Sequence, residues 1–311
     1  MKSLIFAVSM AAALVTGIWS THPATAHSDA LVVATTGNPA MVTRLAESYT
    51  RLTGTPVHPR TLSPKQIPSD ADLILVDNVH TLETLKDQLL PVAAKSLALK
   101  IPQSLRDPDH HWIGLTFRGE TLVFNSRKIK AEALENMDTL AQPRWKGRLL
   151  MPARALAEPQ PAGSRKKDSP ADSQAWQANL ARPPYGDDTQ TLEALALGEG
   201  DLARVSTASY IRFMAENPAL SLDMFRGNSQ GVLPVTISGA GVLKSSPKPQ
   251  EAVRFLKWLT GNTAQKIMSN ATLEYPANVR VRPMTLTAPW NDIITEITAP
   301  EAVDTQSPAT L

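Results

Sequence analysis

Apolar residues in the first third of the chain form short continuous runs that alternate with helical patterns. The run at residues 31–34 is typical of a buried strand. Asn38 and Pro39 then begin a stretch in which apolar residues recur every three or four positions, and Gly54 ends it, so the sequence predicts a helix between them. A second apolar run, at 71–76, is followed by a second helical pattern. Repeated strand-helix units favour a parallel sheet covered by helices, and therefore an α/β fold.

The same alternation continues in the rest of the chain. Two strands are predicted at 112–115 and 121–124, and the polar residues Arg118, Gly119 and Glu120 between them are interpreted as a turn. Later patterns predict helices at 175–180, 189–197 and 249–259, strands at 202–205 and 235–238, a tight glycine passage at 239–241, and a helix that begins at Ser206 and Thr207. The predicted class therefore stays α/β throughout.

The first 26 residues have the features of a secretory signal peptide. Lys2 precedes an apolar run at 4–19, and Ala24 and Ala26 occupy the small-residue positions before a cleavage site. We therefore expect residues 1–26 to be removed and the mature chain to lie in the periplasm.

The length of 311 residues predicts two domains, or two lobes of one fold. Residues 153–173 are rich in proline and carry the basic run Arg165-Lys166-Lys167. This composition is typical of a flexible surface linker, so a linker is predicted there.

Composition excludes several classes of function. The chain has no cysteine, which excludes disulfides, thiolate metal sites and a cysteine nucleophile. The formal net charge is only +2, without the basic patches of proteins that bind nucleic acid. No Gly-x-Ser-x-Gly elbow occurs, and His110 and His111 are adjacent on a predicted extended segment, where their side chains point to opposite sides. The chain is therefore interpreted as a binding protein and not as an enzyme.

Several segments resemble the ferric-iron-binding periplasmic proteins of bacterial ABC importers, a group within the type II solute-binding fold. They are ADLIL at 71–75, PDHHWIGL at 108–115, PRWKGR at 143–148, ISGAGVLK at 237–244, EAVRFL at 251–256 and LEYP at 273–276. The resemblance implies two α/β lobes joined by crossing strands and a hinge, with the ligand in the cleft between them. By analogy, residues 29–116 and 235–284 form the first lobe, 117–234 the second, and 285–311 a C-terminal tail. It also implies a monomer that delivers its ligand to an ABC transporter permease in the inner membrane.

The sequence departs from this family at the usual iron ligands. Fe³⁺ favours negatively charged oxygen ligands, and the family supplies them with an adjacent tyrosine pair at the start of a helix. The corresponding positions carry Ala208 and Ser209, and Tyr210 falls one place beyond. Two further positions at which the family often has tyrosine carry Ala34 and Phe124. We therefore expect a chelated or anion-bridged form of iron to fit better than the bare ion.

The candidate binding residues combine anion-binding groups with the remaining tyrosines. They are Thr36, Asp77, Arg118, Tyr185, Ser206, Thr207, Ser209 and Tyr210, and Tyr210 is also a candidate metal ligand. Arg118 matches a position at which the family places an arginine against the small anion that completes iron coordination. The resemblance thus implies Fe³⁺ with a synergistic anion and no tightly bound cofactor.

The leading hypothesis is the periplasmic solute-binding component of an ABC transporter for Fe³⁺ or a ferric chelate. Two alternatives stay open. One keeps the fold but changes the ligand to an organic anion or a polyol. The other is a sensor or interaction relative of the family that does not serve transport.

Overall fold

The computed structural model describes residues 30–62, 70–93, 95–135, 137–157, 170–226 and 234–287. The predicted signal peptide, the central part of the predicted linker and most of the predicted C-terminal tail lie outside these residues. Across the described ranges, no helix combines the length and the apolar character needed to cross a membrane.

The strands are β1 (Leu31–Thr35), β2 (Val57–Thr61), β3 (Leu73–Val76), β4 (Ile113–Asn125), β5 (Leu149–Leu150), β6 (Leu202–Ser206), β7 (Leu222–Met224), β8 (Val235–Val242) and β9 (Tyr275–Pro276). The α-helices are α1 (Pro39–Thr53), α2 (His80–Thr84), α3 (Lys95–Ala98), α4 (Arg154–Ala157), α5 (Pro170–Ala178), α6 (Asp188–Leu197), α7 (Thr207–Glu216), α8 (Pro249–Leu259) and α9 (Asn262–Thr272). Short 3₁₀ helices occupy Lys86–Gln88, Gln103–Leu105, Ala131–Ala133, Met137–Ala141 and Pro143–Trp145.

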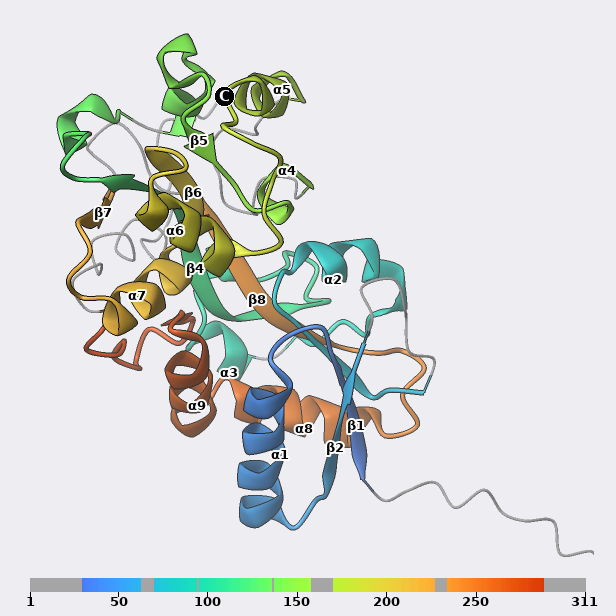
Figure 1. The fold of residues 1–311 in the computed structure, drawn as a ribbon. Coiled ribbons are helices and arrows are strands. Elements are labelled where there is room, and N and C mark those ends of the chain that lie inside the picture. Colours follow the sequence, from blue (N-terminus) through green and yellow to red (C-terminus); the bar gives the residue numbers. More distant parts are fainter. Residues whose placement is uncertain are drawn as a thin grey trace, which may run out of the picture.

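The strands form one mixed sheet in the order β2-β1-β3-β8-β4-β6-β5, and β7 and β9 each pair with β4. β1 is parallel to β2 and β3, whereas β8 is antiparallel to both of its neighbours. Figure 1 shows β4 and β8 running between two groups of elements. We call the group of β1, β2, β3, α1, α8 and α9 the first lobe, and the group of β5, β6, β7 and α4 to α7 the second lobe. The predicted two-lobed α/β fold is confirmed, and the exact residue boundaries of the lobes stay predictions.

β4 contradicts the prediction of two strands joined by a turn. It is one continuous strand, and the predicted turn residues Arg118–Glu120 lie in its middle. Gly119 still pairs with Val235 of β8, whereas Glu120 pairs with Ser206 of β6, so β4 passes from one lobe to the other at this point. These residues are polar because they make buried ion pairs at the crossing, and not because a turn exposes them to solvent.

β8 runs beside β4 and has glycine where other elements come close. A Cβ atom on Gly239 would lie 2.6 Å from Val79 Cγ1 and 2.8 Å from Ile113 O. The predicted tight passage at 239–241 is therefore a stretch of strand between closely packed neighbours, with no space for a side chain at Gly239.

Helix starts and ends agree with the sequence wherever a capping residue marks them. The Asn38 side chain accepts a hydrogen bond from Met41 N at 3.2 Å, and Gly54 ends α1 in the left-handed conformation with φ 77°. Ser206 caps α7 in the same way by accepting from Ser209 N at 3.1 Å. Because Ser206 is also the last residue of β6, this cap fixes the start of α7 against β4.

The predicted linker at 153–173 is wrong at its ends. α4 begins at Arg154 and α5 begins at Pro170. Arg154 binds Asp188 at 2.6 Å, and this ion pair holds α4 against the start of α6. The linker was predicted from amino-acid composition alone. Composition gives no information on a contact between residues as far apart in the sequence as Arg154 and Asp188.

The first prediction concerns the crossing strands. Gly239→Ala should lower the free energy of unfolding by about 1–3 kcal/mol, because the new methyl group would meet a backbone oxygen that has no freedom to move away. Urea unfolding measures this change. Gly37→Ala is the control, since its nearest neighbour would be Thr35 Oγ1 at 3.5 Å, an ordinary contact. Equal stability of the two variants would contradict the close packing at β8.

Candidate functional site

Two predicted site residues follow neighbouring parallel strands of the first lobe. Thr36 comes directly after β1 and Asp77 directly after β3. The carboxyl ends of parallel strands meet at one edge of a sheet, where α/β proteins commonly bind ligands. The Thr36 hydroxyl donates to Asp77 Oδ1 at 3.0 Å, so the structure brings these two candidate residues together.

Arg118 lies beside this edge but already has an acidic partner. Its Nη1 donates to Asp77 O at 3.1 Å and to Glu274 Oε1 at 2.7 Å. The other oxygen of Glu274 accepts from the Thr116 hydroxyl and, at 2.9 Å, from the Ser238 hydroxyl. Burial acts to lower the pKa of Arg118, but the Glu274 carboxylate outweighs it and the pKa is raised. An external anion would therefore compete with Glu274 for this guanidinium group.

The register of β4 and β6 places the start of α7 against the middle of β4. Glu120 is directly opposite Ser206, so their side chains lie on the same face of the ladder. The Ser206 hydroxyl contacts the Ser209 hydroxyl at 2.8 Å. Thr207 Oγ1 accepts from Gly119 N at 3.1 Å. Ser206, Thr207 and Ser209 thus lie where β4 passes between the lobes, and their role in ligand binding stays a prediction.

Arg154 joins two buried carboxylates in the second lobe. Its Nη1 lies 3.0 Å from Glu120 Oε1, and its Nη2 lies 2.6 and 2.7 Å from the two oxygens of Asp188. Asp188 Oδ2 also accepts from Ser206 N at 3.0 Å. Burial acts to raise the pKa of Asp188, but the Arg154 charge and the Ser206 N–H overcome it and hold the pKa below its usual range. The Asp188 carboxylate is therefore ionised at neutral pH.

We call this set of contacts the strand-crossing cluster; it comprises Thr116, Arg118, Glu120, Arg154, Asp188, Ser206, Ser238 and Glu274. Two guanidinium groups of this set face three carboxylates. A third guanidinium, that of Arg204, is buried on the same face of the sheet, two residues before Ser206, so these buried charges balance. The oxygen atoms of the cluster are hard donors of the type that hard metal ions prefer.

The two candidate tyrosines have hydrogen-bond partners outside the cluster. The Tyr210 hydroxyl is buried and donates to Leu222 O at 3.3 Å. Burial raises the pKa of Tyr210 to about 12, which opposes the phenolate form that a ferric ion needs. The Tyr185 hydroxyl donates to Glu199 at 2.8 Å. Tyr210 follows Ser209 in α7, and its role as a metal ligand stays a prediction.

The other two tyrosines of the chain are packed in the first lobe. The Tyr49 ring lies 4.8 Å from the Phe255 ring and 5.2 Å from the Trp258 ring. The Tyr275 hydroxyl donates to Thr287 O at 3.1 Å. This bond also ties Thr287, part of the predicted C-terminal tail, to the first lobe.

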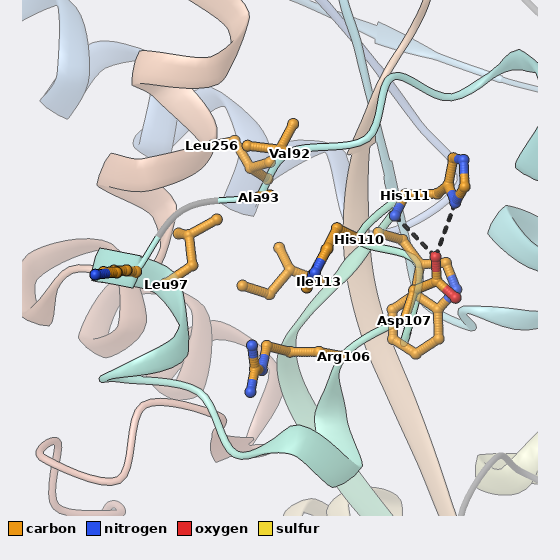
Figure 2. Close-up of a pocket in the computed structure, with 11 residues that line it drawn as sticks. Val92, Ala93, Leu97, Arg106, Asp107, His110, His111, Ile113 and Leu256 are labelled. Carbon is orange, nitrogen blue, oxygen red and sulfur yellow. Dashed lines mark hydrogen bonds and ion pairs between the residues drawn. The ribbon is translucent and has the colours of Figure 1, made fainter.

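A separate cavity of about 250 Å³ lies in the first lobe, shown in Figure 2. Asp107, at its edge, binds the backbone N–H and the ring of His111. Ligand atoms of Asp107, Asp109 and His111 lie within 4.8 Å of one another, as in a metal site. However, Lys86 Nζ already binds Asp107 at 2.9 Å and Asp109 at 2.8 Å, so the group carries its own cation.

His110 has φ 67° and is not in the extended conformation that the sequence predicted.

Sequence reasoning missed most of the charged residues of the cluster. Glu120 was assigned to a turn and Arg154 to a linker, and Asp188 stood just before the helix predicted at 189–197 and was not among the candidate residues. A signal for Glu120 was present, because Arg118 and Glu120 stand two positions apart between apolar strand residues, as polar residues on one face of a strand do.

The two lobes, the two strands that pass between them and the polar cluster at the crossing define a solute-binding protein of the two-lobed kind. Residues 30–271 match the family described as bacterial extracellular solute-binding protein, and the chain belongs to this family. The predicted family and fold are thereby confirmed.

The chain is also similar to curated proteins and solved structures whose names refer to iron uptake or ferric-iron binding. Iron uptake protein A1 of Synechocystis sp. is 31% identical over 223 residues, which are 67% of this chain and 62% of that protein. The alignment thus covers less than two thirds of that relative. The major ferric iron-binding protein of Neisseria meningitidis serogroup B is 27% identical over 76% of this chain and 77% of that protein.

Among solved structures, Trichodesmium FutA in complex with iron and citrate is 25% identical, with a TM-score of 0.71 over 84% of this chain and 90% of that chain. The ferric binding protein from Campylobacter jejuni is 22% identical, with a TM-score of 0.72 over the same shares.

The second prediction concerns the ion pairs of Arg154. Arg154→Met should lower the free energy of unfolding at pH 7 by about 3–5 kcal/mol, because Glu120 and Asp188 would remain buried without a cation. Burial, which acts to raise the pKa of Asp188, would then no longer be opposed by Arg154, so the folded state would bind more protons than the unfolded state. The variant should therefore recover stability as the pH falls from about 7 to 5.

The wild type should behave in the opposite way, because the pKa of Asp188 is lowered in the folded protein. Its stabilisation is present above the ordinary carboxyl pKa and is lost as the pH falls through the lowered value. Urea unfolding as a function of pH compares the two proteins. Arg254→Met, which removes an exposed pair with Glu251, is the control and should change little. An Arg154→Met variant as stable as this control would contradict the account of the cluster.

Proposed function

We propose that this chain is the periplasmic solute-binding component of an ABC transporter for iron, taken up as Fe³⁺ or as a ferric chelate. The ligand would lie between the lobes at the strand-crossing cluster. The observation that carries the proposal is that Thr36, Asp77, Arg118 and the start of α7 meet where β4 passes between the lobes. Membership of the solute-binding family and relatives named for iron uptake support it.

The chemistry of the cluster fits a hard, highly charged cation. Fe³⁺ prefers oxygen ligands with negative charge. Family members supply tyrosinates, whereas the phenols of Tyr185 and Tyr210 here have partners elsewhere. Carboxylates and hydroxyls of the cluster would take their place, and a small anion such as citrate would complete the coordination. Such an anion would have to displace Glu274 from Arg118, or bind the metal without it.

The remaining features of the proposal follow from the family resemblance and from the predicted signal peptide. The mature protein would be monomeric, exported by cleavage of residues 1–26, and would deliver iron to a permease in the inner membrane. Closure of the lobes around the ligand would select one conformation from an equilibrium of open and closed states. The protein would perform no catalysis.

The third prediction concerns iron binding by the wild type. Protein freed of metal and dialysed against ferric citrate should retain iron, measured by mass spectrometry of the metal. Its visible spectrum should show a weak tyrosinate-to-iron charge-transfer band or none, because the hydroxyls of Tyr185 and Tyr210 have hydrogen-bond partners outside the cluster. Citrate alone should bind more weakly than the ferric complex.

Tyr210→Phe distinguishes the two ligand sets. Retention of iron by this variant would support the carboxylate set. Loss of iron together with an intense band in the wild type would show that Tyr210 leaves Leu222 to bind the metal. If the wild type keeps citrate but no iron, the ligand is an organic anion and the proposal is wrong.

A further inference from the structure

The cavity of about 250 Å³ in the first lobe lies apart from the strand-crossing cluster and shares no residue with it. Its walls are largely apolar, because the buried side chains of Leu97, Ile113 and Leu256 line it. Pockets for drug-sized ligands have volumes of roughly 300–1,000 Å³, so this smaller space fits a single aromatic ring or a short aliphatic chain.

Two basic side chains, Lys95 and Arg106, also line this cavity. Arg106 is directly opposite Ile113 in an antiparallel pair, so the two side chains lie on the same face, and Figure 2 shows both directed into the same space. Arg106 Nε donates to Pro102 O at 3.4 Å. Within the described residues neither Arg106 nor Lys95 forms an ion pair, so the terminal N–H groups of Arg106 can bind an external carboxylate.

The one carboxylate that lines the cavity, that of Asp107, is already bound by other groups. Its Oδ1 accepts from Lys86 Nζ at 2.9 Å, and its Oδ2 accepts from His111 N at 2.8 Å and contacts the His111 ring at 3.0 Å. Lys86 also pairs with Asp109, which is 67% exposed and does not line the cavity. The positive charges of Arg106 and Lys95 are therefore left facing the cavity.

His110 adds a hydrogen-bonding ring at a place where the backbone favours glycine. Its φ of 67° lies in the left-handed region, and a side chain there costs backbone strain that glycine avoids. The conformation is fixed by two backbone bonds, from His110 N to Asp107 O at 3.0 Å and from Val92 N to His110 O at 2.8 Å. The His110 side chain lines the cavity beside Ile113. An imidazole in this position offers an N–H donor to a bound anion.

We propose that this cavity binds a small organic monoanion, namely an aromatic or short aliphatic carboxylate. The apolar body of the ligand lies between Leu97, Ile113 and Leu256, and its carboxylate pairs with the Arg106 guanidinium, with His110 as a second donor. Apolar walls combined with a few placed polar groups are typical of small-molecule sites. This second site is separate from the proposed iron site and does not depend on it.

The fourth prediction uses benzoate as the probe in calorimetric titrations of the metal-free protein. Benzamide has the ring without the charge and acetate has the charge without the ring, so each should bind at least about tenfold more weakly than benzoate. Arg106→Gln should weaken benzoate binding to a similar degree. Arg44→Gln, an exposed arginine of α1 that does not line the cavity, is the matched control and should bind benzoate as the wild type does.

His110→Gly separates binding from stability. Glycine adopts a φ of 67° without strain, so the urea midpoint of the ligand-free variant should equal or exceed that of the wild type. Its affinity for benzoate should nevertheless fall, because a donor is lost. A residue that serves only the fold would show no such combination.

Each other outcome would overturn the assignment. Benzoate binding that is equal in the wild type, Arg106→Gln and His110→Gly would place the probe elsewhere. Equal binding of benzamide and benzoate would show that the cavity selects shape without charge, and a wild type that binds no benzoate would refute the site.

Iron retention keeps this inference distinct from the proposed function. Arg106→Gln should retain iron from ferric citrate as the wild type does, and a loss of iron in this variant would contradict the separation of the two sites. If the wild type retains no iron but binds benzoate in the expected pattern, the proposed function fails and this inference stands.

Discussion

The ion pairs of Arg154 are the interaction on which the junction between the lobes depends. β4 carries Glu120 into the protein interior at the point where it changes partners from β8 to β6. A carboxylate remains ionised there only if a cation and hydrogen bonds compensate for the lost water. Arg154 supplies that cation and at the same time binds Asp188, whose carboxylate accepts from the N–H of the α7 cap. One guanidinium group thus ties β4, α4, α6 and α7 together.

This constraint explains why the junction differs in charge from the anion site that the resemblance suggested. Arg118 is in the expected region, but Glu274 already neutralises it. The family places its anion against an arginine, whereas here the chain supplies a carboxylate of its own. The proposed cation would therefore be bound by carboxylate and hydroxyl oxygens and not by phenols, since the hydroxyls of Tyr185 and Tyr210 are hydrogen-bonded elsewhere.

Local patterns sufficed for elements whose signals lie within a few residues. The caps Asn38 and Ser206 and the stop at Gly54 are examples, because capping depends on one side chain and the adjacent backbone. The middle of β4 was misassigned because Arg118, Gly119 and Glu120 have the composition of a turn. Only the pairing with β8 and β6 reveals that their charges are matched inside the protein.

The prediction of the candidate site was limited in the same way, because contacts between residues far apart in the sequence leave no local signal. Thr36, Asp77, Arg118, Ser206, Thr207 and Ser209 could be placed because they follow strands or begin a helix, positions that a resemblance fixes well. Glu274 is 156 residues from Arg118, and Arg154 is 34 residues from both Glu120 and Asp188. No sequence window connects such partners. Tyr210 was selected because tyrosine is the usual iron ligand of the family. Its hydroxyl group instead donates a hydrogen bond to the backbone oxygen of Leu222 in β7.

The most direct test is a crystal structure of the iron-loaded protein with anomalous scattering measured at the iron edge. The account predicts one anomalous peak at the junction of the lobes, close to the start of α7. A peak at Asp107, Asp109 and His111 instead, or the absence of any peak at the junction, would contradict it.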